Sequence, residues 1–80
     1  MVPAIASLRA RAEEIRQAEL ARSAARLSEH ERLELDSITT RMLNKLLHLP
    51  TVRMKEAAVT AEGVAYAEAV RHLFGLEEEL

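Results

Sequence analysis

The chain has 80 residues, a formal net charge of −2 and no cysteine, which excludes disulfide scaffolds, cysteine-ligated metals and thiol nucleophiles. Two glycines and two aromatic residues are too few for a glycine-rich phosphate loop or a base-stacking platform. By count, alanine and leucine supply 26 residues, whereas valine and isoleucine supply only eight. This balance is typical of helices rather than of sheets, so we expect an all-α protein.

A long first helix is predicted from about Pro3 to Arg26, because proline is tolerated in a first turn and no later glycine or proline interrupts the segment. Apolar residues recur along it with the spacing of a heptad seam at Ile5, Leu8, Ala12 and Ile15. Oppositely charged residues stand three or four apart and are expected to pair, namely Arg9 with Glu13, Glu13 with Arg16, and Glu19 with Arg22.

A second long helix is predicted to begin at about Glu29, because Ser28 and Glu31 have the spacing of a capping box. We expect it to end before Pro50, since the residue ahead of a proline is disfavoured in the helical conformation. Its apolar residues form a stripe too wide for one partner helix, and they are Leu35, Ile38, Met42, Leu43, Leu46, Leu47 and Leu49.

Two shorter helices are predicted to follow, one over 51–59 and one over 61–74 with Thr60 as a further cap. Gly75 is expected to end the last helix in the left-handed conformation, with Leu76 folding back onto it. The acidic residues 77–79 are expected to form a frayed tail.

The predicted helices are too unequal in length to make a closed core. A first helix of about 36 Å exceeds the roughly 30 Å diameter of a compact domain of this size, and two short helices cannot cover both long ones. We therefore expect an antiparallel helical bundle that is completed by a second copy. The expected dimer interface consists of Ile5, Leu8, Ile15, Leu35, Ile38, Met42, Leu43, Leu46, Leu47 and Phe74.

No catalytic, cofactor-binding or metal-binding residues are predicted. The three histidines lie on separate segments without metal-ligand spacing, and the hydroxyls near residue 39 have no neighbouring base along the helix. The alternative function is binding of RNA, in particular tRNA, through a helical face that carries Arg11, Arg22 and Arg26. Acidic residues within the same helix make a solvated, paired face the more favoured interpretation.

The sequence is also expected to belong to a cytoplasmic protein without a membrane partner. Its longest apolar run is too short to span a bilayer, and residues 1–5 lack the basic and apolar regions of a signal peptide.

Several strings resemble the C-terminal dimerisation domain of glutamyl-tRNA reductase. The most specific is Asn-Lys-Leu-Leu-His-Leu-Pro-Thr at 44–51. Residues 8–16 with Glu19 and Leu20 are similar to the end of that family's long spinal helix, 28–32 to the start of its next helix, and 74–76 to its terminal motif. The resemblance covers nearly the whole chain.

This resemblance implies a parent enzyme that uses NADPH to reduce glutamyl-tRNA to glutamate-1-semialdehyde, the entry step of tetrapyrrole and haem synthesis. The family's cysteine nucleophile and NADPH-binding domain have no counterpart here, so residues 1–80 are expected to be a single dimerisation domain, a fragment without cofactor. Implied partners are a second copy, the parent's N-terminal domains and, through them, glutamyl-tRNA. By resemblance, the bundle that pairs two protomers includes Leu46, Leu47, His48, Pro50 and Phe74.

Overall fold

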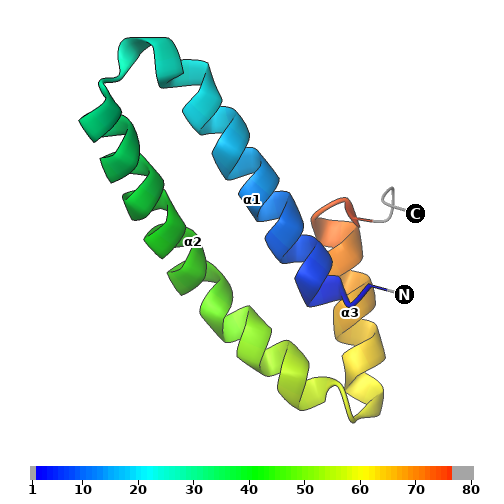
Figure 1. Cartoon of the computed structure of the whole chain (residues 1–80). Coiled ribbons are helices and arrows are strands. Elements are labelled where there is room, and N and C mark those ends of the chain that lie inside the picture. The colour runs from blue at the N-terminus through cyan, green and yellow to red at the C-terminus, as the bar shows by residue number, and fades with distance from the viewer. Residues whose placement is uncertain (1, 77–80) are drawn as a thin grey trace.

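The computed structural model describes residues 2–76, which form three α-helices and one short 3-10 helix (Figure 1). Helix α1 (Ala4–Ser23) and helix α2 (Glu29–Ala57) run antiparallel as a long hairpin, and helix α3 (Ala61–Leu73) packs against both at the open end. The all-α antiparallel bundle predicted from the sequence is therefore confirmed.

The turn between α1 and α2 is built by local hydrogen bonds. The α-helical part of α1 ends at Ser23, and the 3-10 helix Ala24–Arg26 tightens its last turn. The predicted capping box is present: the Ser28 hydroxyl accepts from the Glu31 amide at 3.1 Å, and the Ser28 amide donates to the Glu31 carboxylate at 2.8 Å. This reciprocal cap starts α2 where the sequence predicted.

The prediction that Pro50 ends the second helix was wrong, and so was the separate helix over 51–59. Helix α2 continues through Pro50 to Ala57. The carbonyl that Pro50 cannot bond is that of Leu46, an exposed residue whose carbonyl water can solvate. At the following residue, the Thr51 hydroxyl donates to the Leu47 carbonyl at 2.6 Å and accepts from Arg9 of α1 at 2.8 Å, which ties this part of α2 to α1.

Helix α3 is joined to α2 by a tight turn in which Thr60 is the N-cap, as predicted. Its hydroxyl donates back to the Ala57 carbonyl at 2.8 Å and does not bond an amide of α3. Gly63 is required in the first turn of α3, because a Cβ there would collide with the Ala57 carbonyl oxygen. The close approach of α3 to the end of α2 therefore depends on this glycine.

The end of α3 has the predicted geometry. Gly75 adopts a φ of 67°, and Leu76 folds back so that only 4% of it remains exposed. The acidic tail predicted at 77–79 lies outside the described residues.

The buried core is small and lies at one end of the molecule. Within residues 2–76, the buried hydrophobic residues are Ala4, Leu8, Ala57 and Leu76, all near the place where α3 meets the hairpin. The radius of gyration is 15.2 Å and the extents are 49 × 24 × 18 Å, whereas a compact domain of this length has a radius of about 12 Å. The far part of the hairpin thus extends beyond the core without a third helix to cover it (Figure 1).

Candidate self-association surface

Helix α2 carries apolar side chains on two faces. One face contains Asp36 and Thr51, which bond side chains of α1, and at 100° per residue it also contains Leu43 and Leu47, which are half-buried. The other face lies about 135° away around the helix and is exposed along its length. We call it the α2 stripe, and it consists of Leu35, Ile38, Met42, Leu46 and Leu49.

The exposure of the α2 stripe is large at its centre. Met42 is 56% exposed and Leu46 is 68% exposed, although both are apolar residues in the middle of a long helix. Such a continuous apolar row on a monomer is typical of a protein-protein contact. No part of residues 2–76 covers this row.

Beside the α2 stripe, α1 and α2 enclose a shallow apolar groove of about 310 Å³. Ile15 and Leu20 line it from α1, and Met42 and Leu46 line it from α2. Ile15, a predicted interface residue, is exposed there. The groove and the stripe therefore form one apolar surface on one side of the hairpin.

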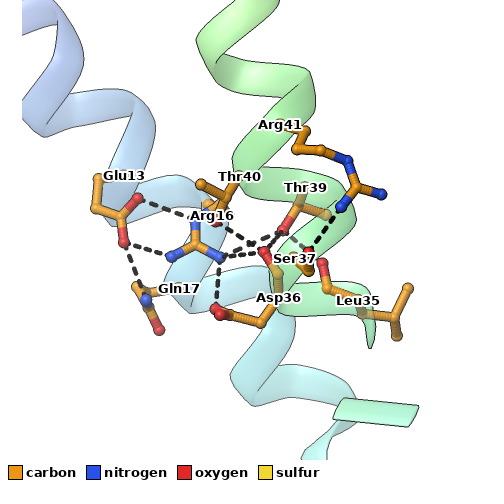
Figure 2. A network of polar contacts seen from close by, with 9 residues as sticks. All are labelled: Glu13, Arg16, Gln17, Leu35, Asp36, Ser37, Thr39, Thr40 and Arg41. Atoms are coloured by element: carbon orange, nitrogen blue, oxygen red, sulfur yellow. Dashed lines mark hydrogen bonds and ion pairs between the residues drawn. The ribbon is translucent and has the colours of Figure 1, made fainter. Parts of the chain in front are cut away.

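Arg16 connects α1 to α2 at this groove (Figure 2). Its Nη1 donates to Asp36 Oδ1 at 2.7 Å and to the Thr39 hydroxyl at 3.3 Å. Its Nε and Nη2 bond both carboxylate oxygens of Glu13, at 2.9 and 2.6 Å. The Arg16 side chain is only 8% exposed, so the clamp holds the two helices at a fixed separation.

The clamp changes the acid–base behaviour of its members. Hydrogen bonds from Arg16 and then Gln17 lower the pKa of Glu13 from 4.5 to about 2. Hydrogen bonds to Glu13 and Asp36 raise the pKa of Arg16 above its usual range. Both groups are therefore charged at neutral pH, and the ion pair between them is present there.

A second contact between the helices lies closer to the core. Arg9 donates to the Thr51 hydroxyl at 2.8 Å and to the Leu47 carbonyl at 3.4 Å. The sequence predicted that Arg9 would pair with Glu13, but Arg9 reaches across to α2. The other predicted pairs are present, with Arg16–Glu13 at 2.6 Å and Arg22–Glu19 at 3.5 Å.

The predicted interface residues fall into three groups. Ile15, Leu35, Ile38, Met42 and Leu46 are exposed on the shared apolar surface, and Phe74 is exposed at the end of α3. Ile5, Leu43 and Leu47 are half-buried. Leu8 is 4% exposed and already belongs to the core of its own chain.

Sequence reasoning did not identify Asp36 as the partner of Arg16. A usable signal was present, because counting outward from the turn near residue 26 places 16 opposite 36 in an antiparallel hairpin. Leu49 was recognised as part of the wide apolar face but was not included in the expected interface.

The arginine face of α1 is partly neutralised. Arg11 lies 3.6 Å from Glu14, and Arg22 lies 3.5 Å from Glu19. These in-helix pairs reduce the positive potential that a phosphate backbone would meet, so RNA binding through this face is not favoured.

Two further kinds of site are absent from the part of the chain that the structure describes. No group of three or more His, Cys, Asp or Glu side chains lies close enough there to hold a metal ion. None of the helices in residues 2–76 combines the length and the apolar character needed to cross a bilayer.

A helical hairpin with one covered and one bare apolar face defines a class of protein, the helical self-association domain. Comparison with known families shows which family of such domains it belongs to. Residues 1–76 match the family described as "Glutamyl-tRNAGlu reductase, dimerisation domain", and the chain belongs to this family. The family description identifies the chain as a dimerisation domain.

Curated relatives agree with this assignment. The chain is 43% identical over 79 residues to a glutamyl-tRNA reductase of Chloroflexus aurantiacus, and 44% identical over 79 residues to that of Kineococcus radiotolerans. These matches cover 95% and 96% of the chain but only 18% of each relative. The Streptomyces coelicolor reductase is 38% identical over 82 residues, which is 99% of the chain and 14% of the relative. No solved structure matches the chain.

Proposed function

We propose that this chain is the homodimerisation module of a glutamyl-tRNA reductase and that two copies pair through the α2 stripe and the adjoining groove. The observation that carries the proposal is the bare stripe itself: five large apolar side chains in one row on α2, more than a third exposed. Membership of the dimerisation family supports it.

The energetics favour pairing over exposure. Moving a Leu or Met side chain from about half exposed to buried contributes on the order of 1 kcal/mol, and a two-fold interface counts each residue twice. The total is comparable with the roughly 4–15 kcal/mol that association costs in lost freedom. The other side of the hairpin, around Gln17, Ala21 and Arg32, is of mixed polarity, so pairing through one face gives a closed dimer and not a filament.

The activity of the whole protein belongs to the same proposal. The parent would reduce glutamyl-tRNA with NADPH to glutamate-1-semialdehyde in tetrapyrrole synthesis, in the cytoplasm. Its N-terminal domains would bind the cofactor and the tRNA, while this domain would hold two such units together. Family membership and the relatives' printed name support this extension.

A charge placed on the α2 stripe tests the surface. Leu46→Asp should yield a helical monomer, because burial of an unpaired carboxylate at the interface is strongly unfavourable, whereas the monomer leaves this position in water. Leu33→Asp is the matched control, since Leu33 is 55% exposed on α2 but about 140° or more from the stripe. Sedimentation velocity and circular dichroism provide the readouts.

The proposal requires dimers for the wild type and for Leu33→Asp. A Leu46→Asp variant that remained a stable dimer would show that the copies pair through another surface.

A further inference from the structure

The residues along the exposed face of α2 are arranged symmetrically about Met42. Leu46 and Ile38 lie four residues away on either side, and Leu49 and Leu35 lie seven residues away. At eleven residues the symmetric positions are Arg53 and Glu31, which carry opposite charges. The spacing therefore reads the same in both chain directions.

Because α2 is one continuous helix, this symmetric spacing in the sequence is also a symmetric spacing along the helix surface. All seven residues lie in one helix, Glu29–Ala57, which passes through Pro50, and all seven are exposed. From position 31 to position 53 they form a single row about 33 Å long. Had the helix ended at Pro50, Arg53 would not continue this row.

We propose that α2 pairs antiparallel with α2 of a second copy, with the two-fold axis passing beside Met42. This register rests on the proposed self-association and specifies its geometry. Leu49 then meets Leu35 of the second copy, and Leu46 meets Ile38 of the second copy. Met42 meets its own equivalent at the centre.

The charged residues at the two ends of the row favour an antiparallel over a parallel arrangement of the two α2 helices. In the antiparallel pair, each Arg53 faces Glu31 of the second copy, which forms one ion pair at each end of the interface. A parallel pair would place Glu31 on Glu31 and Arg53 on Arg53, so that like charges would oppose it. Glu31 uses Oε1 to accept from the Ser28 amide in the capping box, and Oε2 would accept from Arg53.

Helix α1 fits the same arrangement. Ile15 lies in the groove that Met42 also lines, so it stands beside the proposed axis and would contact the second copy's stripe. The Arg16–Asp36 ion pair at 2.7 Å keeps α1 in place there.

The absence of cysteine from the chain allows a direct test by single-cysteine crosslinking of the full chain. Met42→Cys should form a disulfide with its equivalent under mild oxidation, because both Cα atoms lie next to the axis within the roughly 7 Å limit for a disulfide. Leu35→Cys and Leu49→Cys should each fail alone, since equivalent positions are about 21 Å apart along the axis. A mixture of these two variants should form the mixed disulfide.

The outcomes separate the register from the association itself. Non-reducing electrophoresis should shift Met42→Cys from 9.0 kDa to about twice that mass, with Leu33→Cys as an uncrosslinked control. A dimeric solution mass without the Met42→Cys crosslink, or with self-crosslinking of Leu35→Cys and of Leu49→Cys, overturns the register alone. A monomeric solution mass overturns the proposed function as well.

Discussion

Arg16 joins the two long helices at the apolar groove that they enclose. It is charged and nearly covered, yet each of its guanidinium nitrogens donates to an oxygen of Glu13, Asp36 or Thr39. A guanidinium satisfied on both sides acts as a rigid spacer between two helices. Arg16 therefore joins α1 to α2 beside the α2 stripe, at the groove that these helices enclose.

The clamp predicts a specific pH dependence. The pKa of Glu13 is about 2 in the folded chain, against an ordinary value of 4.5, so the unfolded state binds this proton first as the pH falls. The stability contributed by Glu13 should be complete above about pH 4.5 and should be lost as the pH falls towards 2. Urea unfolding of the wild type and of Glu13→Gln at several pH values measures this contribution as a difference in the free energy of unfolding.

Glu13→Gln should be less stable than the wild type at pH 7, and the difference should shrink to nothing near pH 2. Glu34→Gln, which removes a charge from an exposed position on α2, is the control and should change stability much less. A difference for Glu13→Gln that persisted unchanged down to pH 2 would contradict the lowered pKa.

Single residues were predictable from the sequence where their partners are local. The capping box of Ser28 and Glu31 follows from a spacing of three residues, and the conformation of Gly75 follows from its place after a helix. The Arg16–Asp36 pair and the steric need for Gly63 were not predicted, because both depend on how one helix lies against another. Arg9 illustrates this limit. The sequence predicted that it would pair with Glu13 of its own helix, but it donates to the Thr51 hydroxyl and the Leu47 carbonyl of α2.

At the scale of elements, α2 has two apolar faces with different roles. Leu47 is half-buried on the face toward α1, and its carbonyl accepts from Arg9, whereas Leu46 is exposed on the stripe. One step along the sequence therefore separates a residue that stabilises the protomer from one that is proposed to join two protomers.

Leu47→Asp should unfold the chain, in contrast to Leu46→Asp. Aspartate at position 47 would remove the apolar contacts of a half-buried leucine and partly bury a carboxylate against α1. Even with Arg9 nearby, this costs about 2 kcal/mol, a large part of the stability of so small a domain. Helicity by circular dichroism at 25 °C should fall sharply for Leu47→Asp. Retention of full helicity by this variant, or loss of helicity by Leu46→Asp, would show that the two faces are wrongly assigned.

Element boundaries were predicted well where capping signals stand, at the starts of α2 and α3. The predicted end of α2 at Pro50 was wrong, because a proline inside a helix is energetically unfavourable but does not always end the helix. Here the freed carbonyl belongs to an exposed residue, and Thr51 with Arg9 fastens the following turn. The outcome matters for function, since the unbroken helix brings Leu49 and Arg53 into line with the α2 stripe.

At the scale of the whole molecule, the chain is a rod with a core at one end. With a length of 49 Å and a thickness of 18 Å, part of the hairpin lies beyond the core, and the α2 stripe of a single copy stays in contact with water. The helix lengths and the number of apolar residues in the sequence predicted that the short helices cannot cover both long ones. The sequence did not predict which face is left bare, because that depends on the angle at which α1 and α3 approach α2.

The mass of the wild-type chain in solution tests the central claim most directly. Light scattering at tens of micromolar protein should give about twice the protomer mass of 9.0 kDa, because the α2 stripe of each copy is then covered by the other. A single species at 9.0 kDa at this concentration would contradict the claim that two copies pair.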